Sequence, residues 1–212
     1  MNTMAGKFIV FEGIDGTGKT TQLQCVANVL REKGYNVYTT AEPTGTATGK
    51  LLRAFLGGKE RSTPWAAASL FLADRINHNT DPEDGIIKHL SDGDIVLCDR
   101  YYYSTFAYQG TDTDLQWISD SHFNCPEVTK PDACVFLTMD IEKCLARIHA
   151  NRDASAVEIF ENTDSLTRIK KRFADVFDML KDRDTIISVD ADGTIEEVTQ
   201  RIMKALTPIL EG

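Results

Sequence analysis

Residues 13–20 read Gly13-Ile14-Asp15-Gly16-Thr17-Gly18-Lys19-Thr20, a run that fits the pattern G-x-x-x-x-G-K-[ST] of a phosphate-binding loop. An apolar, β-favouring stretch at residues 7–12 precedes the run, and helical spacing over residues 19–33 follows it until Gly34. Glycines let the backbone curl around an anion, and the N–H groups that open a helix carry partial positive charge. The run therefore predicts a strand, a loop that binds the phosphates of a nucleoside triphosphate, and a helix.

The polar residues of this run have separate expected roles. Lys19 is expected to reach the β and γ phosphates, and the Thr20 hydroxyl to bind magnesium. We expect ATP to contact Gly13, Asp15, Gly16, Thr17, Gly18, Lys19, Thr20 and Thr21, with Arg147 packing over the adenine or supporting the base of a lid. The loop alone does not choose between a kinase, a GTPase, an ATPase and a motor.

Four more β-favouring runs lie further along the chain, at residues 36–41, 95–98, 133–138 and 185–189. Helical patterns separate them, and one such pattern, over residues 65–79, follows a capping hydroxyl and a proline in Ser62-Thr63-Pro64. Strands without polar alternation, separated by helices, predict a parallel sheet covered on both faces. We expect one α/β domain over residues 1–212, with a mobile lid in the polar stretch at about residues 150–160.

The composition narrows the partners and the cellular setting. The formal net charge is -9, the wrong sign for a protein that tracks along a nucleic-acid backbone, although a small polyanion can still bind where a few basic residues converge. No apolar run approaches the roughly 18 residues that a membrane span needs, and residues 1–7 are too short and polar for a signal sequence. The five cysteines lack the spacing of a zinc site. We expect a cytoplasmic protein with reduced, mostly buried thiols.

Asp99 and Arg100 follow the third predicted strand, at the edge of the sheet where the phosphate-binding loop would also lie. A carboxylate there can hold magnesium, so Thr20 and Asp99 form the predicted metal site. A guanidinium there can grip a phosphate with two hydrogen bonds. The pair therefore predicts a kinase that phosphorylates a second phosphate group.

Four segments together resemble the thymidylate kinases, in that family's order and approximate spacing: FEGIDGTGKTTQ, AEPTGT, FLADR and DRYYYSTFAYQG. The resemblance extends over nearly the whole chain. It implies a three-layer P-loop kinase fold with a five-stranded parallel sheet, ATP and dTMP as substrates, Mg²⁺ as cofactor, and a homodimer.

The resemblance also implies roles for individual residues around dTMP. Phe71 would stack on the thymine ring, Arg75 would hydrogen bond to its O4, and Tyr108 would pack against the 2′ carbon of the sugar and exclude a ribose hydroxyl. Asp15 would contact the 3′-hydroxyl, and the bond between Glu42 and Pro43 would be a cis peptide that lines the site. The full implied acceptor set is Asp15, Glu42, Pro43, Phe71, Arg75, Arg100, Ser104, Thr105 and Tyr108.

Three other functions stay open at this level. Another monophosphate kinase, for UMP, dGMP or a broad pyrimidine set, would differ only in the base pocket. A regulatory GTPase is suggested by Thr129-Lys130-Pro131-Asp132, which mimics a guanine-reading motif but precedes a predicted strand where that motif should follow one. A binding module without chemistry is the third. Tyr101, Tyr102 and Tyr103 are given no role, because a run of tyrosines is as easily half-buried packing.

The phosphate-binding loop of this chain lacks a basic residue that some members of the family carry there. Some thymidylate kinases carry a basic residue inside the phosphate-binding loop, whereas the interior here is Asp15-Gly16-Thr17. The arginine that stabilises the transferring phosphoryl group must then come from the lid. Arg147 and Arg152 are the candidates before Glu158, and Arg152 completes a predicted catalytic set with Lys19, Asp99 and Arg100.

We predict that Arg152→Ala lowers kcat by at least about 10²-fold with little change in KM, because a transition-state arginine contributes mainly after substrates are bound. Arg147→Ala should mainly raise the KM for ATP. Steady-state kinetics of the two variants separate the roles. Unchanged kcat in Arg152→Ala would move the catalytic charge to Arg168 or Arg172 on the following helix.

Overall fold

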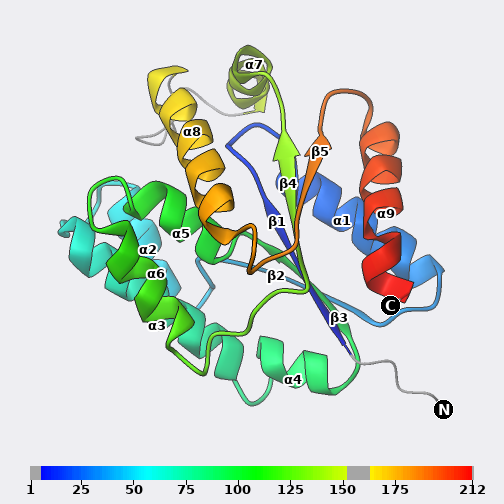
Figure 1. Ribbon diagram of the computed structural model, residues 1–212, viewed down its shortest axis with the longest axis horizontal. Coiled ribbons are helices and arrows are strands. Elements are labelled where there is room, and N and C mark those ends of the chain that lie inside the picture. The colour runs from blue at the N-terminus through cyan, green and yellow to red at the C-terminus, as the bar shows by residue number, and fades with distance from the viewer. Residues whose placement is uncertain (1–5, 152–162, 212) are drawn as a thin grey trace.

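The computed structural model describes residues 6–151 and 163–211, and its centre is a parallel sheet of five strands (Figure 1). The strands are β1 (Lys7–Glu12), β2 (Val37–Ala41), β3 (Ile95–Asp99), β4 (Ala133–Thr138) and β5 (Ile186–Asp190). Their order is β2-β3-β1-β4-β5, and every neighbouring pair is parallel. The five-stranded parallel sheet predicted from the sequence is confirmed, and each strand agrees with its predicted run to within one residue.

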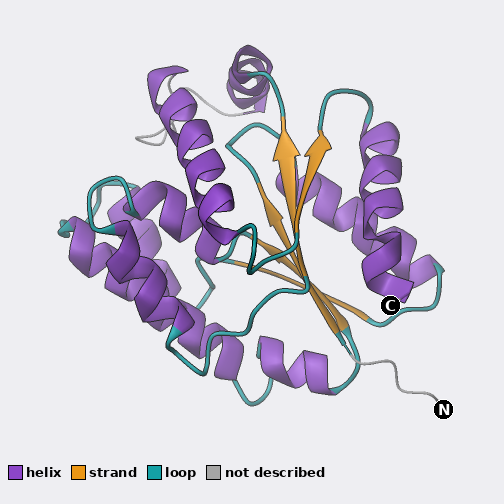
Figure 2. Ribbon diagram, in the orientation of Figure 1, coloured by secondary structure: helices purple, strands orange, loops and turns teal. Residues whose placement is uncertain are grey.

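Helices cover both faces of the sheet and complete the predicted three-layer α/β fold (Figure 2). Helices α1 and α9 lie on one face, and α3, α5 and α8 lie on the other (Figure 1). The helices are α1 (Lys19–Glu32), α2 (Ala47–Leu56), α3 (Pro64–Thr80), α4 (Ile86–Ser91), α5 (Tyr102–Gln109), α6 (Leu115–Phe123), α7 (Ile141–Asn151), α8 (Thr163–Leu180) and α9 (Ile195–Glu211). Among the described residues, no helix is both long and apolar enough to cross a membrane.

The start of α3 follows the predicted capping chemistry. The Thr63 side chain accepts a hydrogen bond from the backbone N–H of Ala66, and Pro64 occupies the first turn. This cap places Phe71, Asp74 and Arg75 on a regular helix, so that their side chains point in directions fixed by the 3.6-residue period.

The buried core is built around β1 and the tyrosine run after β3. Phe8, Ile9, Val10 and Phe11 of β1 are fully buried, and so are all three tyrosines at residues 101–103. No role is assigned to these tyrosines from the sequence, and the structure packs all three into the core more completely than a half-buried run would be. The cysteines are free thiols, of which Cys98, Cys134 and Cys144 are buried.

The segment that mimics a guanine-reading motif lies at the wrong end of the sheet for that role. The Asp132 carboxylate accepts a hydrogen bond of 2.7 Å from the backbone N–H of Phe8, at the amino end of β1. The Thr129 carbonyl accepts a hydrogen bond from the Tyr101 hydroxyl. These contacts close the core opposite the phosphate-binding loop, which argues against a GTPase.

Gly16→Ala and Gly34→Ala make a matched test of how α7 packs on the phosphate-binding loop, since both glycines have left-handed φ angles, 85° and 90°. A Cβ at Gly16 would lie 2.4 Å from the Cys144 carbonyl oxygen in α7, whereas one at Gly34 would meet nothing within 4 Å. We expect Gly34→Ala to cost about 1–2 kcal/mol of unfolding free energy for its backbone conformation. Gly16→Ala should cost about 1–3 kcal/mol more, because α7 must move. Urea unfolding measures both, and equal losses would contradict this packing.

Candidate active site

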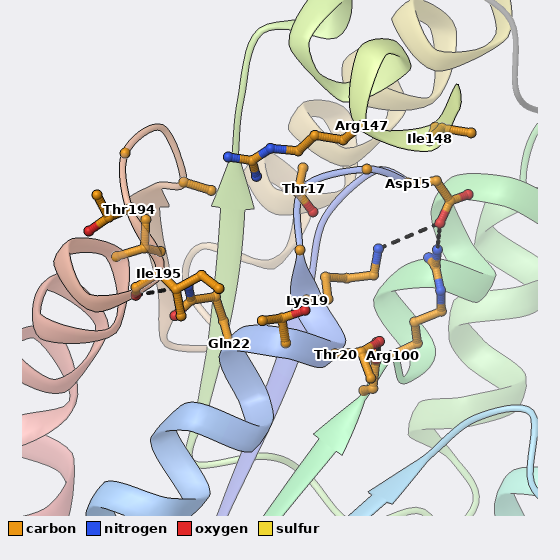
Figure 3. A pocket seen from close by; sticks show the side chains of 17 residues that line it. Asp15, Thr17, Lys19, Thr20, Gln22, Arg100, Arg147, Ile148, Thr194 and Ile195 are labelled. Carbon is orange, nitrogen blue, oxygen red and sulfur yellow. Dashed lines mark hydrogen bonds and ion pairs between the residues drawn. The ribbon is translucent and has the colours of Figure 1, made fainter. Parts of the chain in front are cut away.

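The phosphate-binding loop joins β1 to α1 at the carboxyl end of the sheet and forms the floor of a cavity of about 560 Å³ (Figure 3). Gly13, Gly16 and Gly18 all adopt positive φ, and the Thr17 hydroxyl donates a 2.8 Å hydrogen bond to the Ile14 carbonyl. The cavity wall contains every residue predicted to bind ATP except Gly13, namely Asp15, Gly16, Thr17, Gly18, Lys19, Thr20, Thr21 and Arg147. Further wall comes from Ala191, Gly193 and Thr194, between β5 and α9, and from Ile195 at the start of α9, and Arg147 of α7 lies above the loop (Figure 3).

Lys19 is almost fully buried, and its ammonium group points across the loop towards Asp15 (Figure 3). Nζ donates a 3.1 Å hydrogen bond to the Ile14 carbonyl and lies 3.6 Å from Oδ1 of Asp15. Burial lowers the pKa of Lys19, and the charge of Arg100 lowers it further, against the opposing charges of Asp15 and Asp99. The loop thus holds a cation whose own hydration shell has largely been removed, next to the space that phosphates would occupy.

Thr20 and Asp99 meet across the sheet edge, as the predicted metal site requires. The Thr20 hydroxyl donates a 2.5 Å hydrogen bond to Oδ2 of Asp99, the last residue of β3. No group of three or more His, Cys, Asp or Glu side chains in the described residues could enclose a metal ion. Two hard oxygen donors fit a small cation that takes its other ligands from phosphate and water, as Mg²⁺ usually does.

Arg100, which directly follows β3, also lines the cavity, and its backbone is left-handed, with φ of 69°. Its guanidinium donates to Asp15 and, over 3.0 Å, to the Ser104 hydroxyl, and it lies 5.4 Å from the centre of the Tyr108 ring. Burial raises the pKa of Tyr108 above its ordinary value, against the charge of Arg100, so the phenol stays protonated at neutral pH. Arg100 is therefore a half-buried cation, with 21% of its side chain exposed, framed by a carboxylate, a hydroxyl and an aromatic ring.

Glu12 is a site residue that sequence reasoning missed. It is fully buried at the end of β1 and accepts hydrogen bonds from the backbone N–H groups of Tyr101 and Ser104, at 2.9 and 3.0 Å. Its second oxygen accepts a 2.7 Å hydrogen bond from the Ser104 hydroxyl. Glu12 therefore caps the first turn of α5 and positions Ser104, one of the partners of Arg100. The signal that could have revealed it is a lone carboxylate inside an otherwise apolar strand run.

A second cavity, of about 330 Å³, adjoins the first and shares Asp15 and Arg100 with it. The structure brings all nine residues of the predicted acceptor set into its wall, namely Asp15, Glu42, Pro43, Phe71, Arg75, Arg100, Ser104, Thr105 and Tyr108. The Glu42–Pro43 peptide bond is cis. Arg53, Leu56, Gly57, Tyr101 and Gln109 complete the wall and were not predicted.

Comparison with known proteins gives the same family over almost the full chain. Residues 11–202 match the family described as Thymidylate kinase. A thymidylate kinase of Caldicellulosiruptor saccharolyticus is 35% identical, covering 98% of this chain and 99% of that protein. A probable thymidylate kinase of Methanococcus aeolicus is 36% identical over 94% of this chain and 95% of its own length. One of Pyrococcus abyssi is 32% identical over 99% of this chain and 100% of its own length.

The chain belongs to the thymidylate kinase family. Of the residues predicted to act in catalysis, Lys19, Asp99 and Arg100 lie together around the first cavity. Arg152 and nearly all of the predicted lid lie outside the described residues.

Arg75, which the sequence comparison predicts to contact the base, is only 1% exposed and makes polar contacts on several sides. Its Nε and Nη2 both donate to Oε2 of Glu42, at 2.9 and 2.5 Å, and Nη2 also donates to the Thr105 hydroxyl at 3.1 Å. Nη1 lies 2.6 Å from Nε2 of His122. The other Glu42 oxygen contacts Nδ1 of His78 at 3.0 Å. Arg75 is thus both a wall of the acceptor cavity and the centre of a buried polar network.

Asp74, next to Arg75 in α3, anchors the turn that follows the cis peptide in this thymidylate kinase fold. Its carboxylate accepts hydrogen bonds from the backbone N–H and hydroxyl of Thr44, at 2.8 and 2.6 Å. It also accepts from the hydroxyls of Thr46, at 3.1 Å, and Thr48, at 2.8 Å. Burial alone would raise the pKa of Asp74, but the hydrogen bonds from Thr44, Thr48 and Thr46 outweigh it and hold the pKa below its ordinary value of 3.8.

Asp74→Asn should lower the unfolding free energy at pH 7 by about 1–3 kcal/mol, because the amide keeps the shape but loses the charged acceptor. The folded-state pKa of Asp74 is depressed, so the stability that its charge provides is present above about pH 4 and is lost as the pH falls through the folded-state pKa. Urea unfolding from pH 7 to pH 3 should therefore show the two proteins converging at the acid end. Parallel curves over that range would rule out the charge as the anchor.

Proposed function

We propose that this chain transfers the γ-phosphoryl group of ATP to dTMP. The observation that carries the proposal is the pair of adjoining cavities, one built on the phosphate-binding loop and the other lined by the whole predicted acceptor set, with Asp15 and Arg100 in the walls of both. A phosphoryl transferase needs its two substrates end to end, with their phosphates meeting at shared positive charge. The relatives named as thymidylate kinases support dTMP as the acceptor.

In this proposal the two cations bind different substrates. The N–H groups of the loop and Lys19 hold the β and γ phosphates of ATP, and Arg100 holds the phosphate of dTMP. An oxygen of that phosphate forms the new bond to the γ-phosphorus while the bond from the γ-phosphorus to the bridging oxygen breaks, and ADP leaves with the electron pair. The acceptor is already an anion, so no side chain must act as a general base.

Thr20 and Asp99 would hold Mg²⁺, which when bound neutralises charge on the phosphate oxygens. Their 2.5 Å contact places both oxygen donors beside the loop. Phe71 would stack on the base, and Tyr108 would occupy the space that a ribose 2′-hydroxyl needs. Closure of the lid, with Arg152, would exclude water, which otherwise would accept the phosphoryl group in place of dTMP.

We also propose that the chain acts as a single domain and as a homodimer. Trp65 at the start of α3 and Trp117 on α6 support an interface between copies. Their rings meet edge to face at 5.0 Å between centres, and yet they are 46% and 41% exposed. Such a paired aromatic surface gains stability when a second apolar surface covers it. Sedimentation velocity measures the association directly.

A coupled assay of ADP release with each nucleoside monophosphate tests the proposed reaction. We expect dTMP to give the highest kcat/KM, and Lys19→Ala to reduce turnover by about 10²-fold or more while the protein stays folded, because the substitution removes a charge aimed at the donor phosphates. Circular dichroism of the variant controls for folding. Faster turnover with UMP or dGMP would mean that the acceptor is not dTMP. Near-normal turnover in Lys19→Ala would contradict the role of the loop.

A further inference from the structure

His122, on α6, contacts Arg75 in a protonation state that its neighbours determine. An arginine guanidinium carries only donors, so Nε2 of His122, at 2.6 Å from Nη1 of Arg75, must be an acceptor. Nδ1 of His122 lies 2.8 Å from the carbonyl oxygen of Ile118, which can only accept, so Nδ1 carries the proton. Burial and the charge of Arg75 lower the pKa of His122 to about 3, in agreement with a neutral ring.

The contact with Glu42 does not fix the Arg75 guanidinium by itself. Nε and Nη2 both donate to the same oxygen, Oε2, because the other oxygen of Glu42 faces His78. A fork that rests on two oxygens fixes the guanidinium plane, whereas one that rests on a single oxygen leaves it free to pivot about that atom. Two further contacts stop that rotation: Nη2 donates its second N–H to Thr105, and Nη1, the one nitrogen that does not contact Glu42, donates to His122.

Counting donors leaves one N–H of Arg75 for a ligand. Of its five N–H groups, Nε uses one on Glu42, Nη2 uses one on Glu42 and one on Thr105, and Nη1 uses one on His122. The second N–H of Nη1 has no hydrogen-bond partner among the described residues, and Arg75 lines the acceptor cavity. A neutral imidazole nitrogen has one lone pair, so His122 takes one N–H of Nη1 and leaves the other.

We propose that His122 is a positioning residue for base recognition: it holds Nη1 of Arg75 so that one N–H is presented to a carbonyl oxygen on the base. This inference rests on the proposed function, because it requires a pyrimidine in the acceptor cavity. A base with a carbonyl at position 4 accepts that hydrogen bond. A base with an amino group there sets donor against donor, and the mismatch leaves buried polar groups unpaired. His122 therefore contributes to rejection of cytosine without touching the nucleotide.

The test compares dUMP with dCMP, which differ at position 4 and in the proton on N3, in the full-length protein and three variants. His122→Leu keeps apolar bulk but removes the acceptor. His122→Gln keeps an acceptor at the reach of Nε2. Ser121→Ala removes the neighbouring hydroxyl, which donates to the same Ile118 carbonyl and lies 3.4 Å from Nδ1 of His122 but makes no contact with Arg75. It is the matched control, because it changes the Nδ1 side of the ring and leaves Nε2 in place.

We expect His122→Leu to lower the ratio of kcat/KM for dUMP to that for dCMP at least about fivefold, mainly through the KM of dUMP. The KM for ATP and the ratio of dTMP to dUMP should stay constant, since neither depends on the 4-carbonyl. His122→Gln should restore most of the ratio, and Ser121→Ala should not change it. Calorimetry without ATP should show the same ranking of the variants in their affinity for dUMP relative to dCMP.

An unchanged dUMP-to-dCMP ratio in a folded His122→Leu protein would overturn the inference, as would an equal loss in His122→Gln. If His122→Leu does not fold, His122→Asn replaces it, because the shorter side chain withdraws the acceptor from Arg75. His122→Asn should lower the dUMP-to-dCMP ratio of kcat/KM as well. Failure of the wild-type protein to phosphorylate dTMP or dUMP would instead contradict the proposed function, so the two failures are distinguishable.

Discussion

The carboxylate of Asp15 lets two cations, the buried Lys19 and the half-buried Arg100, lie in one cleft. Lys19 and Arg100 both contact Oδ1 of Asp15, and the charge of Arg100 by itself lowers the pKa of Lys19. Without an anion between them, burial and repulsion would both favour loss of the Lys19 proton. The chain has a net charge of -9 and yet concentrates positive charge in this cleft. Bound phosphate groups would offset the charges of Lys19 and Arg100 as Asp15 does.

The end of β1 connects this charge arrangement to the fold. Glu12 closes the strand and caps α5, whereas the next residues form the loop around Lys19. The backbone N–H of Arg100 donates to Phe11, and its left-handed conformation turns the chain from β3 into α5. Asp15 follows β1 and Arg100 follows β3, so these residues, 85 positions apart in the sequence, lie together at the carboxyl edge of the sheet. The two cavities share these residues because β1 and β3 are neighbours in the sheet.

The sequence predicted what local patterns and motifs can encode. The five strands, the cap at Thr63 and the phosphate-binding loop follow from short-range chemistry, and the family resemblance predicted the nine acceptor residues that the structure brings into one wall. Glu12, Asp74 and His122 were not predicted, because each acts through a partner far along the chain. Glu12 and Ser104 are 92 residues apart, and Arg75 and His122 are 47 apart. Glu12 stands out as a lone carboxylate in an apolar strand run, but no local pattern in the sequence identifies the partner of Glu12, Asp74 or His122.

If Arg75 contacts the base as proposed, the buried network couples recognition of the base to the stability of the fold. Glu42 is paired with Arg75 and His78 in a region almost closed to water, so removing Arg75 would leave an uncompensated buried charge as well as an empty position at the base. A lysine at that position could not replace it, since one ammonium cannot donate along three directions fixed by a planar fork. Partners of Arg75 that are themselves neutral can be changed at lower cost to the fold. Thr105 and His122 are therefore the positions where the proposed recognition of the base would be altered while the buried ion pair stays intact.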